Sequence, residues 1–295
     1  MFYIRKSNSF YFIFCITLLF SSFHFYYTGA MDNEYKGCLA DKYNFKLVKN
    51  ETQIQDLYLK LKLCKAFALD TETTGFDPLK NECVGISISI QEGESFYIPF
   101  AHNVESEQLT REQVVKYLKP IFENEKIEKY FHHAEFDILF LYAVGIDVKG
   151  PIFCSSLAAR CIDLDEKHDL KSLSEAYLGE TMISFKIAVL DNGHKDFSEV
   201  PLDLATKYAA ADAHQTLKIV KVFQKKLQKK QLDQQVYKEI LSREKVLYED
   251  KKKAIQNNDR SKNFFPRETK KRLREDILSL RDEILNPRKR RKVVI

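Results

Sequence analysis

The sequence has no tryptophan, no pair of closely spaced cysteines and no long apolar run. Its six cysteines contain no Cys-X-X-Cys pair, which argues against a zinc ribbon or a redox motif and favours reduced thiols in an intracellular protein. The N-terminal apolar run, from Phe10 to Phe20, is too short and too interrupted to indicate a membrane span. The lack of tryptophan points to no particular function.

The first 30 residues have the layout of a secretory-type signal. Arg5 and Lys6 precede the apolar run, and small residues follow it up to Ala30. Met31 comes next, so a translation start at this methionine is the alternative, in which residues 1–30 are not made. We expect an organelle reached through the secretory route in the first case and the cytoplasm or nucleus in the second. In both cases we expect no stable membrane partner once the segment is gone.

The net charge of +5 is unevenly distributed along the chain. Residues 221–295 carry 24 lysines and arginines against 11 aspartates and glutamates, a net charge of +13, whereas the preceding residues are net acidic. An acidic body with a basic end indicates contact with a polyanion, either nucleic acid or a membrane surface. A solvated lysine-rich helix explains the same charges equally well.

Apolar patterns over residues 31–228 predict one layered α/β domain, in which strands come first and then alternate with helices. Thr110 and Gln113 have the spacing of a capping box, and the helix that they begin is expected to stop at Pro120. The predicted strands cover residues 65–69, 83–90, 95–100, 130–131 and 152–154. The predicted helices cover residues 51–61, 110–119, 136–145, 155–161, 168–179 and 202–227.

Residues 229–295 are predicted to form a basic helical C-terminal extension, with charged helical patterns over residues 236–255 and 267–285. The second pattern carries one apolar stripe, which suits either a short coiled coil or docking on the domain surface. The stripe consists of Leu273, Ile277, Leu280 and Ile284. A basic cluster over residues 287–293 is typical of nuclear import signals or phosphate contacts.

Five side chains on three predicted elements suggest a common site. Asp70 and Glu72 end the first strand at positions i and i+2, so they share one face. Two such carboxylates repel each other and are costly to desolvate unless a cation lies between them. Asp137 lies among apolar residues at a helix start, and Tyr208 and Asp212 lie one helical turn apart with only alanines between them.

The chemistry of this set predicts an enzyme that hydrolyses phosphodiester bonds. Four carboxylates without a histidine or cysteine ligand pattern select Mg²⁺ or Mn²⁺ rather than zinc. Two such ions about 3.5–4 Å apart can stabilise both the attacking and the leaving oxygen of a phosphoryl displacement. The hydroxyl of Tyr208 can orient the attacking water.

The same residues resemble the three motifs of the DEDDy 3′-5′ exonucleases, most closely those of the proofreading domain of DNA polymerase I. The motifs are Asp70-Thr71-Glu72-Thr73-Thr74-Gly75, Phe136-Asp137 and Tyr208-Ala209-Ala210-Ala211-Asp212. The resemblance extends over residues 45–225. It implies the RNase H-like fold of that family, a mixed five-stranded sheet flanked by helices.

The resemblance also implies the role of each residue. Asp70, Glu72 and Asp212 would hold one divalent cation, Asp70 and Asp137 would hold the second, and Tyr208 would orient the nucleophile. The tyrosine, in place of the histidine of the sister subfamily, sets the subclass. The positions that resemble substrate contacts around the terminal nucleotide are Leu69, Thr73, His133 and Phe136.

The function that the resemblance implies is exonucleolytic cleavage of single-stranded or frayed DNA 3′ ends, in replication or repair, in an intracellular DNA-containing compartment. No polymerase sequence follows, so a separate DNA polymerase is a candidate partner, and the basic extension is expected to contact phosphates beside the site. RNase D-like trimming of RNA 3′ ends is the alternative, because His133 stands where the family usually has asparagine. Cys154 likewise stands where these domains often have aspartate. A catalytically idle nucleic-acid-binding remnant is a third possibility, against which the five intact residues argue.

Overall fold

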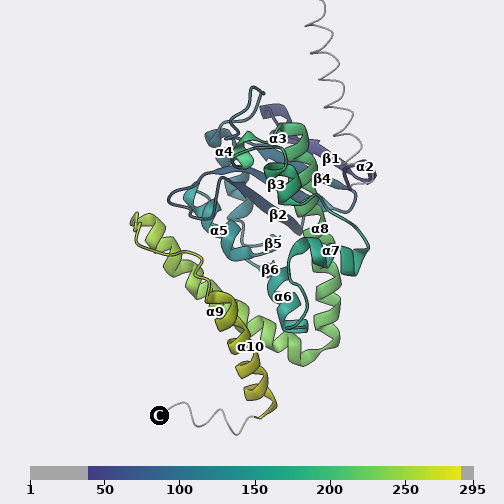
Figure 1. Cartoon of the computed structure of the whole chain (residues 1–295), viewed down its shortest axis with the longest axis vertical. Helices are drawn as coiled ribbons and strands as arrows, with labels where there is room; N and C mark the ends of the chain where they lie inside the picture. The colour runs from purple at the N-terminus through teal and green to yellow at the C-terminus, as the bar shows by residue number, and fades with distance from the viewer. Residues whose placement is uncertain (1–38, 287–295) are drawn as a thin grey trace, which may run out of the picture.

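A mixed sheet of six strands forms the centre of the described part of the chain (Figure 1). The structure is a computed structural model and describes residues 39–286, so the predictions for residues 1–30 and 287–293 lie outside the described residues. The strands are β1 (Asn44–Leu47), β2 (Ala66–Thr73), β3 (Cys83–Gln91), β4 (Glu94–Pro99), β5 (Glu128–Phe131) and β6 (Ile152–Cys154). Their order is β1-β4-β3-β2-β5-β6, with β2–β3 and β3–β4 antiparallel and the other neighbours parallel.

The predicted mixed sheet flanked by helices is confirmed, with one strand more than the five expected. The additional strand is β1, which pairs in parallel with β4 at the edge of the sheet. Its sequence, Asn44-Phe45-Lys46-Leu47, has no continuous apolar run, and none of its residues is fully buried. Hydrogen bonding to β4, rather than a local pattern, makes this segment a strand.

Helices cover both faces of the sheet. The helices of the domain are α2 (Leu39–Lys42), α3 (Glu51–Leu63), α4 (Arg111–Phe122), α5 (Ala134–Ala143), α6 (Ser155–Ile162), α7 (Leu170–Leu178) and α8 (Leu202–Lys229), with a π-helix at Lys186–Leu190 and a 3-10 helix at Phe197–Glu199. Phe67 of β2 packs against Phe122 of α4, with 5.3 Å between the ring centroids. Asp70 and Glu72 project from the opposite face of β2, which α8 covers.

The end of helix α4 differs from the prediction. Its capping box between Thr110 and Gln113 is present as predicted, but the helix does not stop at Pro120 and continues to Phe122. Proline near the end of a helix removes only one intrahelical hydrogen bond. Burial of Ile121 and Phe122, which are 2% and 0% exposed, stabilises the last turn in spite of that loss.

The C-terminal extension packs against the domain through two long helices. They are α9 (Gln231–Gln256) and α10 (Thr269–Leu285). Helix α9 contacts α5 and α6, and the backbone N–H of Cys154 donates to the Tyr237 hydroxyl at 2.9 Å. Helix α10 packs on α9 and buries Ile277 and Leu280, so the apolar stripe docks within the chain. The domain boundary at residue 228 stays a prediction.

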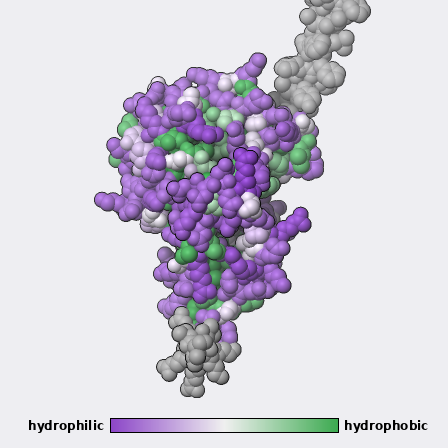
Figure 2. All heavy atoms as spheres, turned by 90° about the vertical axis from the view of Figure 1, so that its left-hand side faces the viewer, coloured by the Kyte–Doolittle hydropathy of each residue, from purple (hydrophilic) through white to green (hydrophobic). Residues whose placement is uncertain are grey.

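The surface on the side where α9 extends is mostly hydrophilic, with apolar side chains exposed in small areas (Figure 2). Within residues 39–286, no helix has both the length and the apolar character that crossing a membrane requires.

Candidate active site

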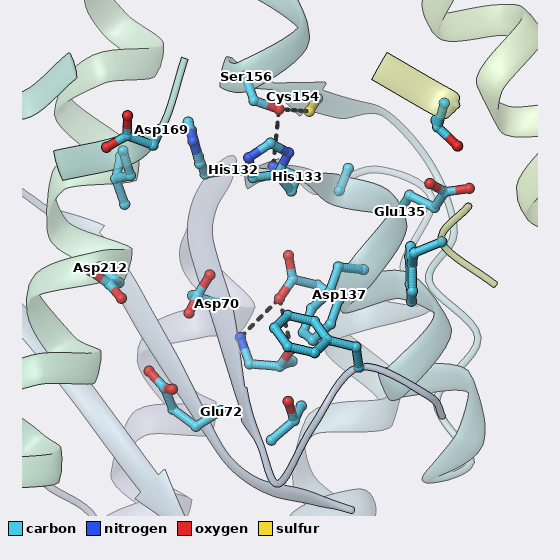
Figure 3. Close-up of a pocket in the computed structure, with 18 of the residues that line it drawn as sticks. Asp70, Glu72, His132, His133, Glu135, Asp137, Cys154, Ser156, Asp169 and Asp212 are labelled. Atoms are coloured by element: carbon cyan, nitrogen blue, oxygen red, sulfur yellow. Dashed lines mark hydrogen bonds between the residues drawn. The ribbon is translucent and has the colours of Figure 1, made fainter. Parts of the chain in front are cut away.

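Three of the four predicted metal ligands converge where β2 meets α8. Asp70 and Glu72 come from β2 and Asp212 from α8, and one carboxylate oxygen of each lies within 4.8 Å of the other two (Figure 3). The helix reaches the sheet this closely because residues 209–211 are alanines, all of which are buried. Alternation along β2 places Asp70 and Glu72 on one face, and the packing of α8 on that face brings Asp212 to them.

The fourth carboxylate, Asp137, lies beside this group in the first turn of α5 and is bound to β2. Its Oδ1 accepts hydrogen bonds from the Thr71 backbone N–H at 2.9 Å and from the Thr71 hydroxyl at 2.7 Å (Figure 3). Strand β5 pairs with β2 only as far as Ala68, which leaves this N–H open to the side chain. The other oxygen, Oδ2, has no hydrogen-bond partner within the described residues.

Desolvation dominates the electrostatics of the site. Burial, together with the neighbouring carboxylates, raises the pKa of Asp70 and of Glu72 well above their usual values. Burial also raises the pKa of Asp212, against the opposing effect of Lys171. It raises the pKa of Asp137 to about 7 in spite of the two hydrogen bonds from Thr71.

Two buried carboxylate oxygens of this group have no hydrogen-bond partner within residues 39–286. They are Glu72 Oε1 and Asp137 Oδ2, in side chains that are 7% and 1% exposed. Burying charged oxygens without partners is unfavourable unless a cation compensates them. Carboxylate oxygens are the ligands that hard divalent cations prefer, so these residues fit a site for such cations.

Tyr208 lies on the same face of α8 as Asp212 and is 8% exposed. Burial raises the pKa of its hydroxyl well above the usual value, so the group remains a hydrogen-bond donor. Lys171, from α7, places Nζ 3.4 Å from the Tyr208 hydroxyl and 3.4 Å from Asp212 Oδ1. Its ammonium also lies 4.5 Å from the centroid of the Tyr208 ring. Lys171 was not predicted as a site residue, because nothing in the sequence of its helix distinguishes it from a surface lysine.

The predicted substrate contacts divide into two groups. Thr73, His133 and Phe136 line a cavity of about 820 Å³ that also contains the carboxylates. Leu69 does not reach this cavity. Its side chain is fully buried in the core, because Leu69 and the adjacent Asp70 point to opposite faces of β2.

His133 begins α5 with an unusual backbone. Its φ of 67° and ψ of 52° are left-handed, and its side chain makes no capping hydrogen bond. The backbone N–H instead donates to the Ser156 hydroxyl at 3.2 Å, which connects this turn to α6 (Figure 3). The turn leaves the imidazole exposed at the cavity and starts the helix that carries Asp137.

Aromatic residues at the cavity were also missed. Phe76 lies three residues after the end of β2 and is 79% exposed, and Phe185 is 45% exposed. A large apolar side chain exposed at a cavity indicates a binding site, but only the structure shows which side chains are exposed. Phe265, from the segment between α9 and α10, also lines the cavity.

Comparison with known proteins agrees with this geometry. The family model described as 3′-5′ exonuclease, that of the exonuclease domain of A-type DNA polymerases, matches residues 45–228. DNA polymerase I of Chloroflexus aurantiacus is 37% identical over 186 residues, covering 62% of this chain and 19% of the polymerase. That of Pseudomonas aeruginosa is 35% identical over 176 residues, covering 57% and 19%. The chain thus spans about a fifth of the length of these relatives.

Solved structures share the fold at low identity. Brucella melitensis NrnC superposes with a TM-score of 0.51 at 20% identity, covering 69% of this chain and 92% of NrnC. The catalytic core of RRP6 from Trypanosoma brucei superposes with a TM-score of 0.52 at 17% identity, covering 67% and 50%. The resemblance inferred from the three motifs is confirmed. Because the family model covers more than half of the chain, the protein belongs to the 3′-5′ exonuclease family of A-type DNA polymerases, a family of hydrolytic exonucleases.

Proposed function

We propose that the chain is a divalent-metal-dependent exonuclease that removes nucleotides from DNA 3′ ends and releases nucleoside 5′-monophosphates. One observation carries the proposal: oxygens of Asp70, Glu72 and Asp212 meet within 4.8 Å in a cavity whose walls also include Asp137 and Tyr208. These are the five residues that the three motifs specify. A module that only bound nucleic acid would gain nothing from desolvated carboxylates, which repel phosphate.

We propose that the site binds two divalent cations, either Mg²⁺ or Mn²⁺. Asp70, Glu72 and Asp212 would hold one, and Asp70 with the free oxygen of Asp137 would hold the other. When bound, the ions supply positive charge that stabilises the attacking and leaving oxygens of the displacement. The hydrogen bonds from Thr71 fix one oxygen of Asp137 and leave the second directed to the site.

Tyr208 and Lys171 are the remaining polar groups near the scissile bond in this proposal. The protonated hydroxyl of Tyr208 would hold the nucleophilic water in line with phosphorus. Lys171 reaches both this hydroxyl and Asp212, so its ammonium offsets part of the carboxylate charge in the metal-free protein. Neither residue has to transfer a proton for the water to be oriented.

DNA is preferred over RNA in this proposal because the DNA polymerases I above match at 35–37% identity, whereas the RNA alternative depends on His133. The proposed setting is DNA replication or repair in an intracellular DNA-containing compartment. A separate DNA polymerase is the proposed partner. It would bring the mismatched or frayed ends on which such a nuclease acts.

A nuclease assay on matched 5′-labelled DNA and RNA oligonucleotides tests the proposal. Wild-type protein is expected to shorten DNA from the 3′ end in Mg²⁺ or Mn²⁺ and not in EDTA, and Asp70→Ala is expected to abolish the ladder of products. Faster cleavage of RNA than of DNA would select the RNA 3′-end trimming alternative. Metal-dependent cleavage that survives Asp70→Ala would overturn the assignment of the site.

A further inference from the structure

The cavity that holds the carboxylates has a wall formed by the C-terminal extension. The match to the exonuclease family ends at residue 228, yet later residues line the same cavity as Asp70. Tyr248 of α9 and Leu273 of α10 are among them, and between these helices Phe265 and Arg267 also reach the cavity. We call residues 264–273 the C-terminal wall. The C-terminal wall therefore lies outside the residues that the family model matches.

The C-terminal wall is fastened to the domain beside the site. Lys251 of α9 forms an ion pair with Glu135 of α5 and donates to the backbone carbonyl of Phe264. Phe264 itself is 2% exposed. Arg272 pairs with Glu244 at 2.9 Å, which connects the start of α10 to α9. Figure 1 shows the segment between the two helices on the side of the molecule where α5 lies.

Three phenylalanines meet at this wall. The rings of Phe265 and Phe136 lie 5.5 Å apart between centroids at an interplanar angle of 39°, and the rings of Phe76 and Phe136 lie 6.1 Å apart at 67°. Phe136 directly precedes Asp137, so the aromatic group lies next to the predicted metal ligands. Aromatic side chains that remain accessible beside a nuclease site are suited to stack with unpaired nucleobases.

Some basic residues of α10 and of the segment before it form ion pairs, and others do not. Arg274 and Arg281 pair with Asp165 and Asp233, and Lys271 lies 3.9 Å from Glu275. Lys270 lines the cavity and has no ion-pair partner within residues 39–286. The same holds for Arg267. Within residues 264–286, the cations without an ion-pair partner are thus Arg267 and Lys270, and both line the cavity, where substrate phosphates would pass.

We infer that the C-terminal wall is a substrate subsite in which Phe265 stacks on a nucleobase near the 3′ end while Arg267 and Lys270 contact the adjacent phosphates. The inference rests on the proposed function and specifies its substrate as an unpaired strand. A base held in a duplex cannot present its face to Phe265, so frayed or single-stranded ends are selected. The cations also offset the repulsion between the strand and the acidic centre.

Substitution of Phe265 tests the stacking. Phe265→Ala is expected to raise KM for a single-stranded oligonucleotide about 5- to 150-fold, because stacking on an aromatic side chain stabilises a bound base to that extent. Phe265→Trp should restore it. In substrates with one abasic site at each of the last three nucleotides in turn, one position should remove the difference between wild type and Phe265→Ala. Equal KM values for wild type and Phe265→Ala, or a difference that persists with every abasic substrate, would overturn the stacking.

Lys270 and Lys271 form a matched pair for the phosphate contact, since both lie in the first turn of α10. Lys270→Ala should reduce the slope of log affinity against log salt by about one, as expected for one lost phosphate contact. Lys271→Ala should leave the slope unchanged. Equal slopes for the two variants would overturn the contact.

Two further measurements separate the failure of this inference from that of the proposed function. Hydrolysis of the p-nitrophenyl ester of thymidine 5′-monophosphate reports on the carboxylate centre with a single nucleotide. Wild type that cleaves the ester while Phe265→Ala binds and degrades oligonucleotides normally would refute the subsite alone. Wild type that cleaves neither substrate in Mg²⁺ or Mn²⁺ would refute the proposed function. In that case equal dissociation constants of wild type and Phe265→Ala for a fluorescent oligonucleotide would refute the subsite as well.

Discussion

Replacing Asp70 with asparagine is expected to stabilise the metal-free protein while it abolishes activity. Oxygens of Asp70, Glu72 and Asp212 lie within 4.8 Å of one another, so two ionised carboxylates there repel by about 3 kcal/mol at an effective dielectric constant of about 20. The ammonium of Lys171 opposes part of this repulsion at Asp70, so the expected gain is smaller, about 1–2 kcal/mol. Asparagine keeps the size of the side chain and removes its charge.

Thermal unfolding with and without Mg²⁺ measures both effects. In EDTA, Asp70→Asn should unfold at a Tm about 2–8 °C above wild type, since 1 kcal/mol corresponds to about 2–4 °C in a chain of this size. Saturating Mg²⁺ should stabilise wild type by about 3 kcal/mol at a hundred times its dissociation constant, and should leave the variant almost unchanged. Exonuclease activity of the variant should fall by about 100-fold or more.

Asp56→Asn is the matched control, because Asp56 is exposed on α3 away from the cavity. It should alter neither Tm nor activity. The electrostatic reasoning would be refuted if Asp70→Asn lowered the Tm of the metal-free protein, or if its Tm rose with Mg²⁺ as much as that of wild type.

Three further substitutions test other parts of the structure. Tyr208→Phe should lower kcat about 100-fold, because the hydroxyl that orients the attacking water is lost, while the Mg²⁺-dependent rise in Tm persists. An unchanged kcat in initial-rate assays would contradict this role of Tyr208. Lys171→Gln should lower the free energy of unfolding of the metal-free protein by about 1 kcal/mol, because Asp212 loses a cation at 3.4 Å. Calorimetric titration should then show tighter Mg²⁺ binding. Burial alone would raise the pKa of Glu180, but side-chain hydrogen bonds, of which that from Lys218 is the strongest, lower it from 4.5 to about 2. The ionised Glu180 therefore stabilises the fold above about pH 4.5, and this contribution is lost as pH falls towards 2. Glu180→Gln should therefore cost about 2 kcal/mol at neutral pH and flatten the fall in Tm with acid; an unaltered pH profile of Tm would show that the network is not stabilising.

Local patterns predicted most of the fold because its elements follow their own periodicity. Strand β2 begins where the strand over residues 65–69 was predicted but continues to Thr73, and the helix that carries Tyr208 and Asp212 was expected where the structure has it. Strand β1 was missed since only pairing with β4 defines it, and the end of α4 was misplaced because core packing of Phe122 outweighs the effect of Pro120.

The sequence by itself determined that Asp70 and Glu72 share a face of their strand and that Tyr208 and Asp212 share a face of their helix, since alternation and helical spacing are local properties. It also determined the subclass through Tyr208. Only the tertiary structure decided what surrounds them: that Leu69 points into the core, that Lys171 reaches Asp212, and that Phe265 arrives from a segment far along the chain. Such contacts join residues that are distant in sequence, and they depend on how whole helices pack, which no local pattern records.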